Sequence, residues 1–186
     1  ERLIARKENG LVKVITGIRR CGKSYLLFNI YKSYLKSIGV EDDQIICLAL
    51  DDDENIQYRN PLELGKYIRS LTTDESKTYY VFLDEIQNIP EWERVVSTLF
   101  LKGADIYITG SNSQMLSTEL STKLSGRCIE IRVQPLAFRE YLLFRKESGK
   151  DAATLLDDYI RRGGFPAVAL LEDTMPGLVP DMLMGI

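Results

Sequence analysis

Short apolar runs alternate along this chain with segments whose apolar residues recur at helical spacing. After the first run, apolar pairs at positions 26–27, 30–31 and 34–35 mark one buried face of a helix. Strands that alternate with helices favour parallel βαβ units, and nearly continuous apolar strands favour a sheet covered on both faces. The pattern therefore predicts an α/β fold, a three-layer sandwich around a five-stranded parallel sheet. The predicted strands are 11–16, 44–50, 79–83, 105–109 and 128–133.

The chain beyond Pro135 has a different organisation, because helical patterns continue there without any predicted strand. A Gly-Gly-Phe-Pro segment that ends at Pro166 precedes a last short helix. We therefore predict that residues 1–135 form the core that contains the sheet, and that residues 136–186 begin a helical lid or a second domain. Helices are also expected after Pro61, after Pro90, and at 114–123, 137–146 and 152–162.

The segment that joins the first predicted strand to the first helix carries a phosphate-binding pattern. Residues 17–24 read Gly-Ile-Arg-Arg-Cys-Gly-Lys-Ser and fit G-x-x-x-x-G-K-[ST]. Such a loop points backbone N–H groups at one anion, and the helix dipole adds to their effect. Lys23 can reach the β- and γ-phosphates, and Ser24 can ligate Mg²⁺. The alternative interpretation of the motif is a chance match in a tight turn between a strand and a helix. The predicted nucleotide-binding residues are Gly17, Ile18, Arg19, Arg20, Cys21, Gly22, Lys23, Ser24 and Tyr25.

An acid pair, Asp84-Glu85, follows the apolar run 79–83. An acidic residue at the carboxyl end of a buried strand can hold Mg²⁺ directly or through water, so Asp84 joins Ser24 as a predicted metal residue. Glu85 can orient and activate a water for attack on the γ-phosphate, which makes it the predicted catalytic base. A strand that ends in solvated acids is the alternative interpretation.

Two further residues are catalytic candidates on weaker patterns. The run Thr-Gly-Ser-Asn ends the fourth predicted strand, and Asn112, with Ser111 close behind, could hydrogen-bond the γ-phosphate or the attacking water. Turn chemistry explains the same residues equally well. Arg127 could act as an arginine finger in trans on the ATP of a neighbouring subunit, or it could be an ordinary solvent-facing arginine.

Composition limits the kinds of catalysis and the cellular location that we expect for this chain. The chain has 186 residues, a net charge of −3 and no histidine, which excludes histidine-based acid–base catalysis and histidine metal ligation within it. No apolar run is long enough to span a bilayer. Three cysteines, two of them in strand-like runs, predict reduced thiols in a cytoplasmic protein. Its two ends, Glu1 and Ile186, suggest a fragment of a longer protein.

Several motifs in the same order give the chain a family resemblance. The segments VITGIRRCGKSYLL, VFLDEIQNIPEWE, ITGSNSQMLSTELSTKLSGR and IEIRVQPLAFREYL resemble the prokaryotic AAA-type ATPases of the extended P-loop superfamily, and GGFPAV resembles their junction to a C-terminal region. The resemblance implies a sheet in which the fourth strand lies between the first and the third. It implies ATP and Mg²⁺ as cofactors, Lys23 and Ser24 as their ligands, and Asp84 and Glu85 as metal-side acid and catalytic acid/base. Such proteins usually carry a further C-terminal domain with a suspected nuclease-like fold.

The leading hypothesis is therefore an ATPase that uses ATP binding and hydrolysis as a conformational switch. One rival is a nucleotide-gated binding module that does not hydrolyse ATP and recognises a nucleic acid or a protein. Another is a small-molecule kinase, although such kinases usually lack a glutamate directly after the aspartate. A homo-oligomer and a DNA or protein partner are compatible with the sequence, and a membrane partner is not expected.

Overall fold

The computed structural model describes residues 1–110, 124 and 126–170. Five parallel strands form one sheet in the order β2-β3-β4-β1-β5. This arrangement confirms the predicted α/β fold and its five-stranded parallel sheet, with β4 between β1 and β3 as the resemblance implied. The strands are β1 (Val12–Thr16), β2 (Ile45–Ala49), β3 (Tyr80–Asp84), β4 (Asp105–Thr109) and β5 (Cys128–Arg132).

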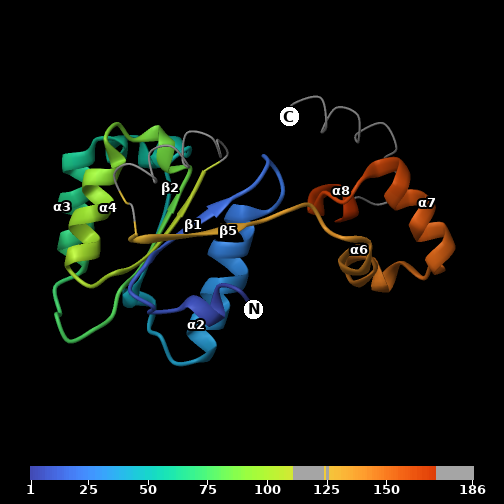
Figure 1. The fold of residues 1–186 in the computed structure, drawn as a ribbon, viewed down its shortest axis with the longest axis horizontal. Helices are drawn as coiled ribbons and strands as arrows, with labels where there is room; N and C mark the ends of the chain where they lie inside the picture. Colours follow the sequence, from blue (N-terminus) through green and yellow to red (C-terminus); the bar gives the residue numbers. More distant parts are fainter. Residues whose placement is uncertain (111–123, 125, 171–186) are drawn as a thin grey trace. The chain divides into compact units, whose positions relative to one another are not determined.

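Helices cover both faces of the sheet. The chain runs from β1 to the far edge strand β2 and then returns through β3 and β4, so the helices before and after that reversal lie on opposite faces. Figure 1 shows α3 and α4 on one face and α2 on the other. The helices of this part are α1 (Lys23–Tyr25), a π-helical stretch (Leu26–Tyr31), α2 (Lys32–Ser37), α3 (Pro61–Leu71) and α4 (Trp92–Leu101).

The main hydrophobic core lies between the sheet and the helices α3 and α4. Alternate strand residues point to the same face of a sheet, and here those residues are aliphatic and buried. They pack against Leu64 and Ile68 of α3 and against Trp92, Val96 and Leu99 of α4. The strand residues of this core are Val12, Val14, Ile46, Leu48, Val81, Leu83, Ile106 and Ile108.

The opposite face of the sheet contains a buried polar network. Lys13 of β1 is fully buried and pairs with Asp105, the first residue of β4. The Tyr107 hydroxyl donates to Asp105 at 2.8 Å, and the Tyr31 hydroxyl lies 2.7 Å from that of Tyr107. Burial raises the pKa of both tyrosines, so both hydroxyls keep their protons. The network therefore ties the helix that precedes α2 to two neighbouring strands.

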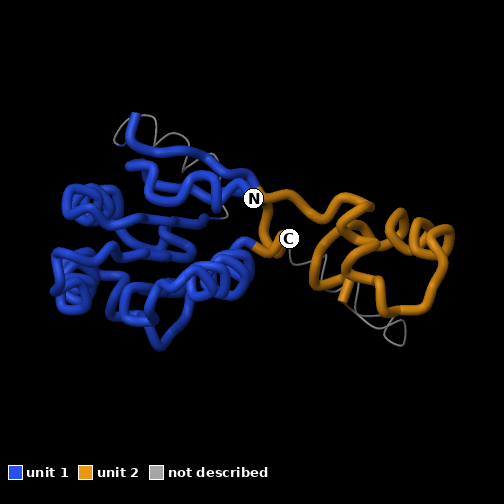
Figure 2. Tube along the Cα trace, turned by 90° about the horizontal axis from the view of Figure 1, so that it is seen from below, with its two compact units in different colours: residues 1–17, 23–132 blue, residues 18–22, 133–186 orange. Residues whose placement is uncertain are grey.

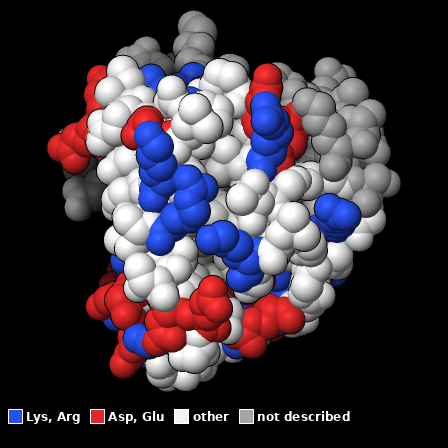
Figure 3. All heavy atoms as spheres, turned by 90° about the vertical axis from the view of Figure 1, so that its left-hand side faces the viewer, with Lys and Arg blue, Asp and Glu red and all other residues white. Residues whose placement is uncertain are grey.

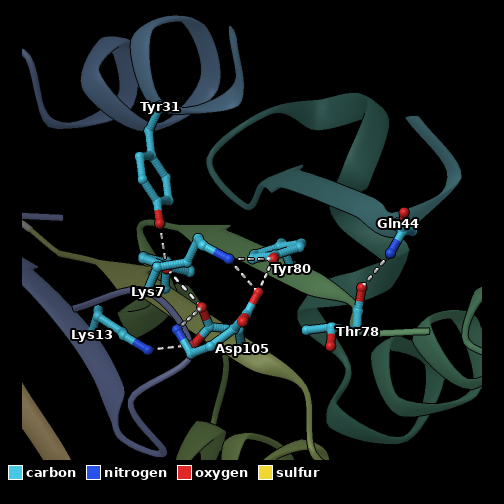
Figure 4. A network of polar contacts seen from close by, with 9 residues as sticks. Lys7, Lys13, Tyr31, Gln44, Thr78, Tyr80 and Asp105 are labelled. Carbon is cyan, nitrogen blue, oxygen red and sulfur yellow. Dashed lines mark hydrogen bonds and ion pairs between the residues drawn. The ribbon is translucent and has the colours of Figure 1, made fainter. Parts of the chain in front are cut away.

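The chain that precedes β1 extends this network at the amino-terminal edge of the strands (Figure 4). The Glu8 backbone N–H donates to the Asp105 carboxylate at 3.0 Å. The Tyr80 hydroxyl donates to the Glu8 carboxylate, and the Lys7 ammonium lies 3.3 Å from the Tyr80 hydroxyl. Residues from the N-terminal segment, β1, β3 and β4 are thereby held at one end of the sheet.

A second compact unit consists of Ile18–Gly22 and the chain from Val133 onward (Figure 2). Its core contains Tyr141, Leu155 and Ala169. The Leu136 N–H donates to the Gly164 carbonyl at 2.6 Å, and a Cβ at position 164 would lie 2.2 Å from the Leu136 oxygen. Only glycine fits there, which explains one glycine of the Gly-Gly-Phe-Pro segment. The described helices of this unit are α6 (Phe138–Phe144), α7 (Ala152–Arg162) and α8 (Pro166–Leu170).

The buried ion pair leads to a stability prediction. Lys13→Ala leaves Asp105 charged and buried without its cation, and we expect it to lower the free energy of unfolding by about 3–5 kcal/mol. Urea-induced unfolding, followed through the fluorescence of Trp92, measures this loss, because Trp92 is the only tryptophan and is buried in the main core.

The matched control is Lys66→Ala, which breaks an exposed i,i+3 pair with Glu63. This change should alter the free energy of unfolding by less than about 1 kcal/mol, because exposed ion pairs contribute little. Equal losses in the two variants would contradict the role assigned to Lys13.

Candidate nucleotide site

The site is built where three neighbouring strands end. Thr16, Asp84 and Thr109 are the last residues of β1, β3 and β4. All three are buried. Because the strands are parallel and adjacent, their carboxyl ends meet at one edge of the sheet, the edge at which ligands bind in open α/β folds.

Asp84 lies between two hydroxyl groups. Thr109 Oγ1 donates to the Asp84 carboxylate. The Ser24 side chain lies near enough to this carboxylate to lower its pKa. Burial raises the pKa of the Asp84 carboxyl, the side chains of Ser24 and Thr109 oppose that rise, and the charge of Glu85 adds to it. The structure thus places the two predicted metal residues, Ser24 and Asp84, near each other at the sheet edge.

Glu85, the residue directly after Asp84, has a left-handed backbone conformation with φ = 51°. Its N–H donates to Thr109 Oγ1 at 3.0 Å, and its carboxylate accepts a hydrogen bond from the Gln87 side-chain amide. The left-handed region is uncommon for residues other than glycine and clusters at functional sites. Both the backbone and the side chain of Glu85 are therefore held by defined partners.

Lys23 is buried at the start of α1, and its ammonium donates to the Gly17 carbonyl at 2.9 Å. Gly17 has φ = 149°, a conformation that glycine adopts without strain. The two ends of the phosphate loop are thus linked by the lysine that is expected to bind phosphate.

The middle of the phosphate loop, Ile18–Gly22, groups with the second unit. Cys21 is buried, and its thiol donates to the Val133 carbonyl at 3.6 Å. A Cβ on Gly22 would lie 3.5 Å from Pro166 Cγ. Arg20 has a left-handed backbone, with φ = 66°. Ile18, Arg19, Arg20 and Tyr25 are exposed.

The remaining predicted residues have different outcomes. Asn112 and its alternative Ser111 lie outside the described residues. Arg127 is exposed immediately before β5, and its backbone is fixed by hydrogen bonds to Leu124 and Val12, at 2.9 and 2.8 Å. Its side chain therefore starts from a well-defined backbone at the surface.

Two residues at the site did not stand out from the sequence. The sequence marks Thr109 only as the start of a turn-like run, yet its hydroxyl is hydrogen-bonded to both Asp84 and Glu85. A polar residue that closes an apolar strand was the available signal. Gln87 was not identified at all, because a glutamine two positions after an acid has no pattern that distinguishes it from a surface residue.

The donor set fits a hard divalent cation. Mg²⁺ prefers oxygen ligands and usually takes one or two from the protein, with waters and substrate phosphates completing the shell. The Ser24 hydroxyl and the Asp84 carboxylate supply oxygens of that kind close to each other. A bound cation would also favour the ionised form of Asp84, which burial disfavours.

A separate groove of about 450 Å³ lies between α3 and α4. Its lining includes Gly65, Arg69, Arg94 and Leu99, and none of the predicted site residues. Figure 3 views the molecule from this side and shows separated Lys and Arg side chains across its middle, with acidic side chains gathered below them. The groove is therefore distinct from the candidate nucleotide site, and this face is not uniformly basic.

Comparison with known proteins gives a family match. The profile of the AAA domain matches residues 9–142. An uncharacterized protein of Haemophilus influenzae is 34% identical over 178 residues, which cover 94% of this chain and 44% of that protein. An uncharacterized protein of Methanocaldococcus jannaschii is 34% identical over 175 residues, which cover 87% of this chain and 37% of that protein. The chain thus spans less than half the length of these curated relatives.

Solved structures share the fold at low sequence identity. Trip13 from Rhizobiales superposes with a TM-score of 0.58 and 14% identity, over 99% of this chain and 69% of its own. The ORC2 protein of Aeropyrum pernix, in its ADP form, gives 0.57 and 15%, over 98% and 61%. Within the described part of the chain, no helix has the length and apolar character needed to cross a membrane.

The shared hydroxyl of Thr109 leads to a prediction. Thr109→Val keeps the shape of the side chain but removes the donor to Asp84 and the acceptor for the Glu85 N–H. We expect a loss of about 1–3 kcal/mol in the free energy of unfolding, the usual cost of stranding buried polar groups. Thr98→Val is the control, since the Thr98 hydroxyl bonds only its own helix, to the Arg94 carbonyl at 2.9 Å. Indistinguishable urea midpoints for the two variants would refute this role.

Proposed function

This chain belongs to the AAA domain family, and on that basis we propose that it binds ATP together with Mg²⁺ and hydrolyses the γ-phosphate. The observation that carries the proposal is the hydrogen-bonded set of Asp84, Thr109 and Glu85 at one edge of the sheet, with Ser24 of the phosphate loop close to Asp84. These residues come from three separate segments, and their proximity combines a metal-side pair with a candidate base. The family resemblance adds ATP as the nucleotide, and the ADP form of the ORC2 protein is a structural relative with an adenine nucleotide.

The phosphate loop supplies the binding part of this function. Lys23 carries the positive charge that would neutralise the β- and γ-phosphates, and its ammonium would exchange the Gly17 carbonyl for phosphate oxygens. The start of α1 lies directly after the loop, so its backbone N–H groups would face the same anion. The role of the loop is therefore to hold the triphosphate by charge and by backbone donors.

The acid pair supplies the chemical part. Ser24 and Asp84 would hold Mg²⁺, which when bound neutralises charge on the phosphates. Glu85 would accept the proton of a water that attacks the γ-phosphorus, and Thr109 fixes the backbone from which the Glu85 side chain projects. A glutamate at this position favours hydrolysis over phosphoryl transfer to a small-molecule hydroxyl.

The loop also offers a route by which nucleotide could act as a switch. Its middle, Ile18–Gly22, belongs to the same compact unit as the helices after Val133. Within this unit Cys21 donates to the Val133 carbonyl, and Gly22 lies beside Pro166. Filling the loop with phosphate would change the surroundings of both contacts. We propose that the helical unit responds to the nucleotide state through them. What the switch controls in the longer protein, whether a DNA or a protein partner, is outside this proposal.

The base and the lysine can be separated by mutation. Glu85→Gln should leave the affinity for ATP within about twofold and lower the steady-state rate by roughly 100- to 10,000-fold, because only the proton acceptor is lost. Lys23→Ala should instead weaken binding, since phosphate charge is no longer neutralised. Mg²⁺-dependent phosphate release and titration with a fluorescent ATP analogue measure the two effects. Normal turnover in Glu85→Gln would remove Glu85 from the mechanism, and tight binding without wild-type turnover would favour a nucleotide-gated binding module.

The exposed Arg127 is proposed to act on the nucleotide of a second copy of the chain. Arg127→Ala should then lower turnover by roughly 1,000-fold or more in the assembled protein, the range for arginine fingers. Mixing Arg127→Ala with Glu85→Gln subunits should restore part of the rate, because each supplies what its neighbour lacks. A mixture no more active than its components would count against action in trans.

A further inference from the structure

The turn after Glu85 brings a glutamine back onto the Glu85 carboxylate. Gln87 lies in a single 3₁₀ turn, Ile86–Asn88, and its Nε2 donates to Glu85 Oε2. Gln87 is partly buried, as is Glu85. The left-handed conformation of Glu85, with φ = 51°, leads directly into the turn in which this contact forms.

This turn is fixed to the rest of the unit by its neighbours. Ile86 and Ile89 belong to the main hydrophobic core, one on each side of Gln87. The Asn88 N–H donates to the Glu85 carbonyl at 3.1 Å, and its side-chain amide donates to the Leu50 carbonyl at 3.4 Å. Because both isoleucines are buried in this core, the backbone on either side of Gln87 is anchored by packing.

We propose that Gln87 is a positioning residue that fixes the orientation of the Glu85 carboxylate for proton transfer; this rests on the proposed role of Glu85 as the base of ATP hydrolysis. A glutamate side chain has three rotatable bonds, and its carboxylate would otherwise sample several directions. The Gln87 amide bonds Oε2 and thereby orients the plane of the carboxylate that would accept the proton of the attacking water. Thr109 holds the Glu85 N–H, whereas the Gln87 amide bonds the carboxylate itself.

The chemical type of the residue fits this role. A neutral amide orients a carboxylate by hydrogen bonding without placing a full positive charge on it. Lysine or arginine at this position would bind the oxygen more strongly and reduce its ability to accept a proton. Asparagine is one methylene shorter and would need the turn to move.

The test compares Gln87→Ala with Gln57→Ala, in wild-type and in Glu85→Gln backgrounds of the full-length protein. Gln57 is an exposed glutamine of the Asp53–Arg59 turn and serves as the matched control. Steady-state kcat and KM for Mg²⁺-ATP, the affinity for a non-hydrolysable ATP analogue, and unfolding followed by Trp92 fluorescence are measured for each protein.

We expect Gln87→Ala to lower kcat by roughly 10- to 100-fold, the range for lost supporting contacts and small misplacements, with analogue affinity within about twofold of wild type. In the Glu85→Gln background the same substitution should change the residual rate by less than about twofold, because its target is already gone. Gln87→Glu, which keeps the length but opposes the carboxylate with a like charge, should lower kcat at least as far. Gln57→Ala should behave as wild type.

The other outcomes overturn the proposal in distinguishable ways. An unchanged kcat means that the contact does not affect catalysis. A raised kcat means that Gln87 holds the Glu85 carboxylate in an unproductive orientation. Equal losses in both backgrounds, or a parallel loss of analogue affinity, mean that Gln87 serves only the structure of the turn. If Gln87→Ala does not fold, Gln87→Glu carries the same comparison. Absence of turnover in the wild type overturns the proposed hydrolysis itself, and this inference falls with it.

Discussion

Parallel pairing of β3, β4 and β1 is the constraint on which the rest of this structure depends. Because the three strands run in one direction and lie side by side, Thr16, Asp84 and Thr109 end at one edge of the sheet. Asp84 and Thr109 are hydrogen-bonded to each other there, and the Thr16 hydroxyl donates to Glu130 of β5. The Thr109 hydroxyl makes two hydrogen bonds at this edge, because it donates to Asp84 and accepts from the backbone N–H of Glu85. An antiparallel neighbour would put its own carboxyl end at the opposite edge and break the constellation.

The same pairing explains the polar network at the other edge. A parallel sheet is covered on both faces, so Lys13, in β1 between β4 and β5, has no access to water. Its charge is tolerated because Asp105 begins the adjacent strand and is itself held by Tyr107 and the Glu8 N–H. Buried ion pairs are weak contributors to net stability, but breaking one is costly, so the network acts chiefly to specify which groups lie together. Buried polar contacts thereby tie the strands together at the amino-terminal edge, whereas the candidate nucleotide site lies at the carboxyl edge.

Backbone conformation sets the details of the proposed catalytic group. Glu85 and Arg20 adopt left-handed conformations, one directly after the acid strand and the other within the phosphate loop. Each costs free energy that the surrounding packing must offset. At Glu85 the offset is visible, because the turn that follows is anchored by Ile86 and Ile89 in the core. The strained residue can then project its side chain toward Gln87, which is the geometric basis of the positioning role.

The sequence by itself determined the fold class, because continuous apolar runs separated by helical patterns leave few alternatives to a covered parallel sheet. Strand bounds predicted from those runs agree with the structure to within a residue or two, and Asp105–Thr109 agrees at both ends. It also indicated the phosphate loop and the acid pair, whose residues are close in sequence. Local patterns could not show that Ser24 lies near Asp84, that Thr109 serves two neighbours, or that Gln87 folds back onto Glu85. Those contacts depend on strand order and on one left-handed residue, and both are decided by packing over the whole sheet, which only the tertiary structure provides.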